Sequence, residues 1–410
     1  MNTRRVLTVT TVFALLPLFA GAKDPFKIEA ALGEKIEAFL KTKDIPGAQL
    51  AVGCEGQIVL SKGFGLADEE NRVAVQPRTL FRLASVSKTL TSAAIFTLIE
   101  AGKLTLDTKM LGVLKVEPFL IEGKKADPRM ADITIRQLLQ HTGGWDRAKS
   151  GDVVFQNQRI SEALKIASPP SARDVIREVL SRPLDFAPGS RYAYSNFGYC
   201  VLGRIIEDLS GVPYGDYVQE HVLDPAGIAG PKLGATFVRA EGETCYHSFD
   251  KDRSKIMSSS AFANVPGKVL APYGSWCLEH MDSLGGWIAP AEDMVRFAMS
   301  LDDFEATSPF KHATTLESML APAPGLPGHT KEGKPLEASY ACGFRTMRGK
   351  DGVSFNHYGS LAGTSTMLMQ RADGWAWAVF FNRSVSRAAR ETFLQEIQKL
   401  FDGLKKETNS

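Results

Sequence analysis

Three serine residues are followed at the third position by a lysine, a spacing that can pair a nucleophile with its base. The three pairs are Ser85 and Lys88, Ser248 and Lys251, and Ser308 and Lys311. A serine hydroxyl attacks a carbonyl carbon only when a neighbouring base takes its proton. A lysine can be that base where burial disfavours its charged form. The surroundings must therefore decide which pair could do this chemistry.

The segment that follows Ser85 differs from those after the other two serines. It is apolar on nearly all sides from Leu90 to Ala101, and Gly102 comes next, which is typical of a buried helix with a glycine cap. Lys88 would lie one turn along the same helix face. Burial there would favour its neutral, basic form.

The other two pairs are not followed by a buried helix pattern. Ser248 lies among charged residues and Ser308 precedes Pro309, so we expect both on the solvated surface. The alternative for Ser85 is a helix N-cap beside a surface lysine. An apolar helix disfavours that alternative without excluding it.

A second candidate group is Tyr194-Ser195-Asn196, the only Tyr-x-Asn in the chain. It precedes an apolar helix, so we expect it on a loop that reaches a cleft between two parts of the chain. A tyrosine there can share the role of the base with Lys88, since a nearby cation favours the phenolate. We expect Asn196 to hydrogen-bond Lys88 and a substrate amide. The alternative is a helix-capping asparagine beside a packed tyrosine.

A third candidate is the stretch "HYGS", which begins at His357 among C-terminal strands. Gly359 would let a substrate lie against the strand edge. The backbone N–H groups of Ser360 and Ser85 would then form an oxyanion hole. A similar His-x-Gly begins at His141 but follows a helix pattern, so we expect it to end that helix and to shape the cleft.

The hydrophobic pattern predicts the elements that must position these groups. Helix periodicity covers 26–42 and 387–404, and strands are predicted at 49–53, 57–60, 339–347, 353–357, 363–369 and 375–381. Two strands alone are unstable, so strands from both chain ends must share one antiparallel sheet flanked by the terminal helices. The expected fold is an α/β part (about 23–85 and 285–410) with an inserted, mainly helical part (about 86–284) and a cleft between them.

The composition of the 410 residues is that of an ordinary globular protein, with 44% hydrophobic and 23% charged residues. The formal net charge of +2 gives no argument for nucleic-acid binding. Arginines followed by a short apolar run and a small-x-small site predict a signal peptide at 1–22, and hence a periplasmic or secreted protein without stable membrane insertion. The alternative is a membrane anchor, for which the run is short. The sequence predicts no oligomeric state.

The chain has five cysteines and no spacing typical of a metal site, so we expect no metal site. Cys245 and Cys277 share a loop-rich segment and are the expected disulfide. We also expect this segment, 236–280, to line the cleft and to influence specificity. The remaining cysteines lie in apolar runs and are expected to be buried: Cys54, Cys200 and Cys342.

Three motifs, taken in order, resemble those of the serine β-lactamase-like superfamily, in particular its branch of class C β-lactamases, D,D-peptidases and esterases: Ser85-x-x-Lys88, Tyr194-x-Asn196 and His357-x-Gly359. The stretches "LLQHTGGW", "FAPGSRYAYSNFGYCVLGRIIEDLSG" and "SLGGWIAPAEDMVRFAMSL" also look like that family, so the likeness covers nearly all of the chain after residue 22. The resemblance implies that Ser85 attacks a carbonyl, that Lys88 and Tyr194 move protons, and that water releases an acyl-enzyme without a cofactor.

The third motif departs from the Lys-Thr-Gly that is usual in β-lactamases of this branch. Here it is His-Tyr-Gly, so a cation for a substrate carboxylate would have to come from His357 or Arg383. Together with the expected signal peptide, the resemblance then implies an exported serine hydrolase of an ester or amide, which includes D-residue peptides derived from the cell wall. Two alternatives stay open: a penicillin-binding D,D-carboxypeptidase or weak β-lactamase, and an inactive binding or sensor protein.

Overall fold

The structure is a computed structural model that describes residues 25–120, 125–248, 257–303 and 306–408. The expected signal peptide at 1–22 lies outside the described residues. None of the described helices combines the length and the apolar character needed to cross a membrane.

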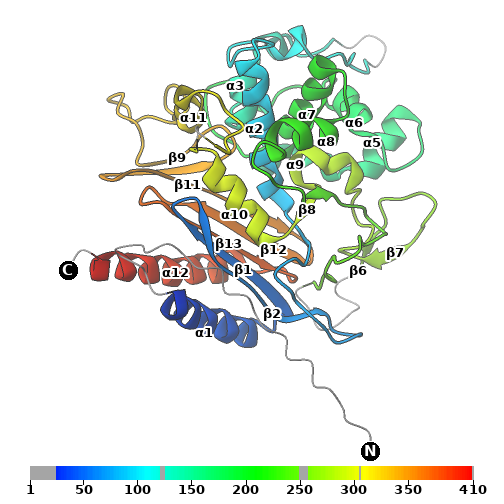
Figure 1. Ribbon diagram of the computed structural model, residues 1–410. Coiled ribbons are helices and arrows are strands. Elements are labelled where there is room, and N and C mark those ends of the chain that lie inside the picture. The colour runs from blue at the N-terminus through cyan, green and yellow to red at the C-terminus, as the bar shows by residue number, and fades with distance from the viewer. Residues whose placement is uncertain (1–24, 121–124, 249–256, 304–305, 409–410) are drawn as a thin grey trace, which may run out of the picture.

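An eight-stranded antiparallel sheet takes its strands from both ends of the chain (Figure 1). Its order is β3-β2-β1-β13-β12-β11-β10-β9. The strands are β1 (Gly47–Cys54), β2 (Gln57–Asp68), β3 (Val73–Ala74), β9 (Ala338–Tyr340), β10 (Arg345–Gly349), β11 (Gly352–Leu361), β12 (Thr364–Gln370) and β13 (Trp375–Phe381). Pairing of β1 with β13, from Ala48 opposite Phe381 to Cys54 opposite Trp375, joins the two ends. The expected shared sheet is confirmed.

The two faces of the sheet are covered by different helices (Figure 1). Because side chains alternate along a strand, Val52 and Val379 face the terminal helices α1 (Pro25–Lys43) and α12 (Arg387–Thr408). Their neighbours Ala51 and Ala378 face the opposite core, where α10 (Ala291–Ser300) packs on β1 and β13. The terminal helices thus cover one face, as predicted, and leave the other for the helical part.

The helical part is built around α2 (Ser87–Glu100), most of whose side chains are buried. Gly102 follows it with a φ of +68°, as expected for the cap. The other helices are α3 (Ile135–Leu139), α4 (Arg147–Ser150), α5 (Asn157–Leu164), α6 (Ala172–Val179), α7 (Asn196–Ser210), α8 (Tyr214–Val218), α9 (Asp282–Gly285) and α11 (Ala313–Leu320). Short strands complete it: β4 (Phe81–Arg82), β5 (Lys232–Leu233) and β8 (Trp287–Ala289) in one sheet, and the hairpin β6 (Met257–Ser259) and β7 (Lys268–Leu270).

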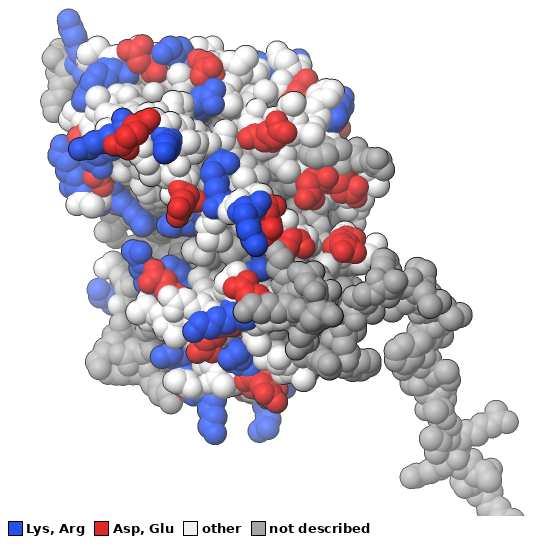
Figure 2. All heavy atoms as spheres, turned by 90° about the vertical axis from the view of Figure 1, so that its left-hand side faces the viewer, with Lys and Arg blue, Asp and Glu red and all other residues white. Residues whose placement is uncertain are grey.

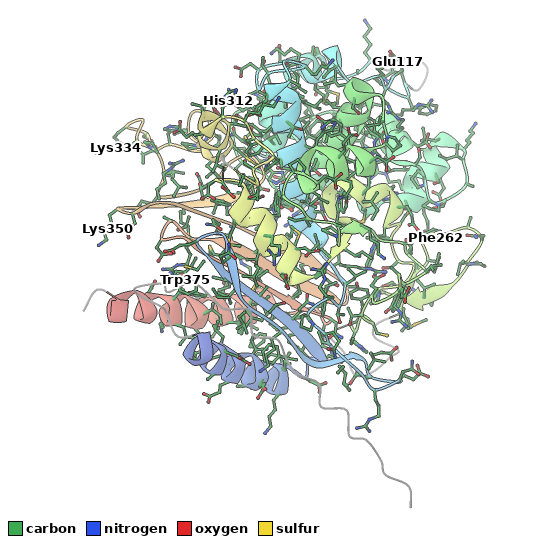
Figure 3. All side chains as sticks on the ribbon, in the orientation of Figure 1. Glu117, Phe262, His312, Lys334, Lys350 and Trp375 are labelled. Atoms are coloured by element: carbon green, nitrogen blue, oxygen red, sulfur yellow. The ribbon has the colours of Figure 1, made fainter. Side chains whose placement is uncertain are left out.

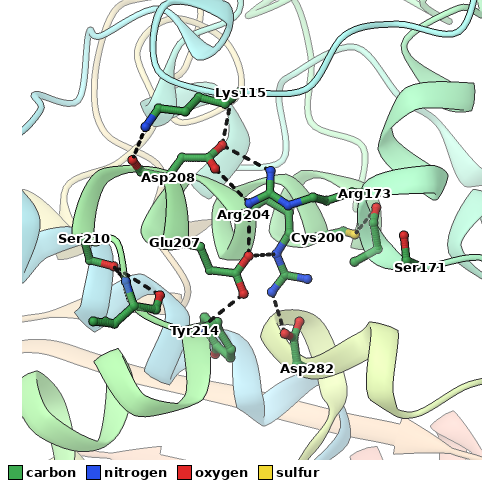
Figure 4. Close-up of polar contacts among 12 residues, drawn as sticks. Lys115, Ser171, Arg173, Cys200, Arg204, Glu207, Asp208, Ser210, Tyr214 and Asp282 are labelled. Atoms are coloured by element: carbon green, nitrogen blue, oxygen red, sulfur yellow. Dashed lines mark hydrogen bonds and ion pairs between the residues drawn. The ribbon is translucent and has the colours of Figure 1, made fainter.

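A buried network of charged side chains fixes α7 against α9 (Figure 4). Arg204 Nη2 lies 2.5 Å from Asp282 Oδ2, and Arg204 Nε lies 2.9 Å from Glu207 Oε2. Helix α7 approaches closely because residue 203 is glycine: a Cβ on Gly203 would lie 2.4 Å from Ser283 Oγ. Loss of one member of a buried ion pair typically costs about 3–5 kcal/mol of folding free energy. The position of α9 is therefore firmly set.

Acidic and basic side chains are interspersed on the face shown in Figure 2. Figure 3 places Lys334 and Lys350 on the opposite side of the molecule from Phe262, which lies in the loop between β6 and β7. The face shown in Figure 2 therefore has no surface of a single charge sign, in keeping with the small net charge of the sequence.

Three local expectations are wrong. Cys54, which was expected to be buried, has intermediate exposure. The strand expected at 339–347 is interrupted between β9 and β10, because Gly343 adopts a φ of +84° where a Cβ would lie 2.5 Å from the Cβ of Ser92 on α2. Cys245 and Cys277 form no disulfide. The Cys277 thiol instead lies 3.3 Å from a carboxylate oxygen of Glu279.

Candidate active site

Ser85 lies on a strained turn at the start of α2. It belongs to a one-turn 3₁₀ helix, Ala84–Val86, in which Ala84 has a φ of +48°. Positive φ is uncommon for residues with a side chain and often accompanies a functional constraint. Ala84 and Val86 are buried, whereas Ser85 is half-exposed. The turn thus presents one hydroxyl at the edge of a buried helix.

Lys88 is completely buried beneath this hydroxyl. Its Nζ lies 3.2 Å from Ser85 Oγ and donates to the carbonyl oxygen of Leu284 on α9 at 2.5 Å. Burial lowers the pKa of Lys88 to about 7; the charge of Asp152 opposes this shift, and that of Arg147 adds to it. The direction is the one expected from the sequence. Neutral Lys88, which can accept a proton from Ser85, is thus well populated near pH 7.

Tyr194 lies beside both groups, but as a phenol. Lys88 Nζ lies 5.3 Å from its ring centroid, and the Arg147 guanidinium lies 4.8 Å from it. Burial nevertheless raises the pKa of Tyr194 above its usual value, and a contact with the Ser85 hydroxyl lowers it by less. The charge of Arg147 does favour the phenolate, as expected of a nearby cation, but burial outweighs it. Tyr194 is therefore expected to act as a proton donor.

Asn196 has a different partner from the one expected. Its Nδ2 donates to Asp152 Oδ2 at 2.6 Å, and its buried Oδ1 has no hydrogen-bond partner among the described residues. The described hydrogen bonds of Lys88 go to Ser85 and Leu284 instead. Sequence reasoning missed Asp152, because it belongs to no motif and the only local signal is the glycine before it.

His357 lies in β11 as a neutral imidazole. Its Nδ1 donates to the carbonyl oxygen of Tyr358 at 2.9 Å, so its Nε2 accepts from the Tyr340 hydroxyl at 2.9 Å. Burial lowers the pKa of His357 well below its usual value, and the charges of Lys88 and Arg345 lower it further. The expectation that His357 could supply a cation is therefore wrong.

Gly359 allows the turn that carries Ser85 to pack onto β11. A Cβ on Gly359 would lie 2.2 Å from the carbonyl oxygen of Leu83 and 2.1 Å from the hydroxyl oxygen of Thr366. The protein's own turn occupies this space, which corrects the expectation that the glycine makes room for substrate. Strand β11 pairs with β12 as far as Leu361, but the described pairing with β10 ends at Asn356.

Ser360 follows on this open edge of β11 and is exposed. An unpaired strand edge offers backbone N–H groups to a ligand. The oxyanion hole formed by the Ser360 and Ser85 N–H groups stays a prediction.

His141 was expected only to end a helix, and it does lie just after α3, with a φ of +57°. Its ring also packs 4.2 Å from that of Tyr194 and 4.4 Å from that of Tyr340. Its Nδ1 accepts from the backbone N–H of Ser195 at 3.2 Å. Sequence reasoning missed this support of the Tyr194 loop, although the motif around His141 was noticed.

The described part of 236–280 supports the strand that leads to Ser85. Arg82 donates from Nη1 to the carbonyl oxygen of Pro272 at 2.6 Å, and its backbone N–H donates to the Tyr246 hydroxyl at 2.8 Å. Its Nε lies 3.6 Å from Glu243 Oε1 in a buried ion pair. An influence of this segment on specificity stays a prediction.

The two other Ser-x-x-Lys pairs do not resemble this site. Ser248 is buried, which contradicts its expected place on the surface, and Lys251 lies outside the described residues. Ser308 is half-buried and donates to the carbonyl oxygen of Leu301 at 3.5 Å, while Lys311 is exposed. An exposed lysine keeps its proton near neutral pH and is a poor base.

The groups around Ser85 are suited to proton transfer and hydrogen bonding. They are an amine, a phenol, an amide and backbone N–H groups, as acyl transfer requires. Within the described ranges, no three His, Cys, Asp or Glu side chains gather closely enough to hold a metal ion.

The Beta-lactamase family model matches residues 32–399, which is most of the chain. The chain belongs to the beta-lactamase family. The predicted family resemblance and fold class are thereby confirmed. The protein is accordingly a member of a family of beta-lactamase-fold hydrolases, and an esterase is among its relatives.

Relatives of this beta-lactamase family member include esterase EstB of Burkholderia gladioli, 33% identical over 239 residues, which are 55% of this chain and 57% of the esterase. The human mitochondrial serine beta-lactamase-like protein LACTB is 30% identical over 235 residues, or 44% of this chain and 42% of LACTB. The chain therefore spans about half the length of these relatives. The solved D-amino acid amidase of Ochrobactrum anthropi SV3 shares the fold, with a TM-score of 0.65, 19% identity, and coverage of 92% of this chain and 99% of that one.

Substitution of Gly359 by alanine should displace the Ser85 turn, because the new Cβ cannot fit against Leu83. We expect the free energy of unfolding to fall by about 1–3 kcal/mol, and the labelling of Ser85 by a fluorophosphonate to be much slower. Gly349→Ala is the control, since no atom lies within 4 Å of its Cβ position. Equal stability and labelling in both variants would contradict this role of Gly359.

Proposed function

We propose that this family member is an exported serine hydrolase that cleaves an ester or amide bond through an acyl-enzyme on Ser85. The observation that carries the proposal is the distance of 3.2 Å between Ser85 Oγ and the fully buried amine of Lys88. Supporting observations are the similarity to an esterase and the fold shared with a D-amino acid amidase.

In the first step of the proposed reaction, neutral Lys88 takes the hydroxyl proton while Ser85 Oγ bonds to the substrate carbonyl carbon. The carbonyl oxygen becomes an anion, which the backbone N–H groups of Ser85 and Ser360 would stabilise. The Tyr194 phenol then protonates the leaving group as the bond between that group and the carbonyl carbon breaks. The carbonyl double bond reforms, which gives the acyl-enzyme, and Tyr194 regains its proton from Lys88. This order follows from the pKa directions, since Lys88 starts neutral and Tyr194 starts protonated.

In the second step, water attacks the acyl carbonyl and Lys88 takes one of its protons. The bond between the carbonyl carbon and Ser85 Oγ breaks, and the proton returns to Ser85. No other reactant is needed. Because His357 is neutral, the site suits an uncharged ester or a small amide on the strand-edge side of Ser85.

A second candidate, a D,D-carboxypeptidase, is favoured by two guanidinium groups whose charges act on His357, those of Arg345 and Arg390. They lie 5.9 Å and 5.2 Å from the ring centroid of Tyr358, which packs against the cluster under the terminal helices, and neither forms an ion pair with any described residue. Such a pair could bind a substrate carboxylate. Arg383, which was expected to be available, is instead paired with Asp44 at 2.7 Å.

The Ser85→Ala variant tests the central proposal. We expect wild-type protein to gain the mass of a fluorophosphonate adduct and to turn over a short-chain p-nitrophenyl ester, and Ser85→Ala to do neither. Ser308→Ala is the matched control and should behave as wild type, since Ser308 lies by an exposed lysine. A fluorescent penicillin adduct on wild type would favour the carboxypeptidase. Absence of all adducts and turnover in wild type would favour the inactive binding protein.

The pH dependence of ester turnover should follow the protonation of Lys88. Since burial lowers the pKa of Lys88 to about 7, the base is mostly protonated below this pH and neutral above it. We expect kcat/KM to rise with pH through an apparent pKa near 7, and Lys88→Arg to lose about 10²–10⁴-fold at every pH. A kcat/KM that does not change between pH 6 and 8 would contradict Lys88 as the base.

The double substitution Arg345→Met and Arg390→Met separates the two candidate substrates. We expect kcat/KM for a D-peptide with a free carboxylate to fall about 10- to 100-fold, as for the loss of charged hydrogen bonds, and that for a neutral ester to stay unchanged. Arg387→Met is the control, because Arg387 is already paired with Glu391 at 2.7 Å. If no D-peptide is cleaved even by wild type, the carboxypeptidase is excluded.

A further inference from the structure

Asp152 is a half-buried carboxylate beside the site that belongs to none of the three motifs. It follows Gly151, whose φ of +74° ends α4 and turns the chain inward. Asp152 and Asn196 line the same small cavity of about 30 Å³. The Asp152 carboxylate accepts a hydrogen bond from Asn196 Nδ2 at 2.6 Å.

This hydrogen bond fixes which end of the Asn196 amide faces the rest of the site. An ionised carboxylate only accepts hydrogen bonds, so it must face the amide nitrogen. Asn196 Oδ1 is therefore turned away from Asp152, and it is buried without a described partner. An unsatisfied buried acceptor is costly, and an N–H of the substrate or of the Lys88 ammonium would satisfy it.

Asp152 forms no ion pair with an arginine or a lysine among the described residues. Arg147 lies over the Tyr194 ring rather than against the Asp152 carboxylate. Lys88 and Asp152 nevertheless act on each other: the charge of Asp152 favours protonated Lys88, and that of Lys88 favours ionised Asp152. Burial opposes the charge on both side chains.

The other titratable groups around Lys88 and Asp152 are neutral or engaged. Burial lowers the pKa of both imidazoles and raises that of both phenols: His141, His357, Tyr194 and Tyr199. Around the small cavity, the remaining charged side chains have partners: Asp146 with Arg191, Asp185 with Lys149, and Arg182 with Glu178. Asp152 and Arg147 are thus the two charged side chains that act on the Lys88 amine.

We propose that Asp152 is a positioning residue of this site: through Asn196 it orients an acceptor toward the reacting groups, and its charge stabilises the Lys88 ammonium that forms when Ser85 gives up its proton. The inference rests on the proposed function. A negative charge is needed near Lys88 because proton transfer creates a buried cation, and an uncompensated buried charge is unfavourable. Asp152 supplies the opposite charge without quenching Lys88 in a permanent ion pair.

The test compares Asp152→Asn and Asp152→Glu with the control Asp185→Asn, which removes a charge from the same cavity but not from Lys88. For Asp152→Asn we expect the acidic limb of kcat/KM for the p-nitrophenyl ester to move to lower pH by about one unit, since the ammonium loses its stabilising charge, with a maximum at least several-fold lower. Asp152→Glu should restore part of the pH shift and part of the maximal kcat/KM. Asp185→Asn should leave the acidic limb at its wild-type pH.

An unchanged limb in Asp152→Asn, with folding confirmed by circular dichroism, would overturn the proposal, as would a shift to higher pH. If Asp152 had only a structural role, its substitution would lower activity without shifting the acidic limb of kcat/KM. If wild type has no turnover, the proposed function fails, and NMR of the lysine side chains still decides the inference. The Lys88 pKa must then be lower in Asp152→Asn than in wild type, and equal values would overturn the role of Asp152.

Discussion

The burial of one amine is the constraint on which the rest of the site depends. Lys88 has no exposed surface, and a charged group in such a place costs several kcal/mol unless a partner compensates it. The protein gives it the carbonyl oxygen of Leu284 as an acceptor and the hydroxyl of Ser85 as a neighbour, both of which suit a neutral amine. Burial thus makes Lys88 suited to be the base that the proposed function requires near neutral pH.

The fold meets this constraint by close packing around the half-exposed hydroxyl of Ser85. Gly359 lets the turn before α2 rest on β11, and the positive φ of Ala84 lifts Ser85 out of the packed region. The ion pair between Arg204 and Asp282 holds α9, and hence the acceptor for Lys88, against α7. Helix α7 begins directly after the Tyr194 loop. The buried network around Arg204 therefore helps to position both this loop and α9.

The sequence predicted the elements and the order of the motifs because these are local properties. Apolar periodicity after Ser85 reports a buried helix, and the strands near both chain ends need each other to form a stable sheet. The partners of polar groups could not be predicted in this way. His357 is neutral and Asn196 faces Asp152 because segments far apart in sequence meet there, and no spacing within one segment encodes such a meeting.

The central claim is that Lys88 is a neutral base near pH 7, and direct titration of its side chain tests it. NMR of protein with ¹³C-labelled lysine, with the Lys88 signal assigned from its loss in Lys88→Met, gives the pKa without any assumption about substrate. The account predicts one lysine that titrates near pH 7 while exposed lysines titrate near 10. A Lys88 pKa near 10 would contradict it, because the serine would then have no base in this site.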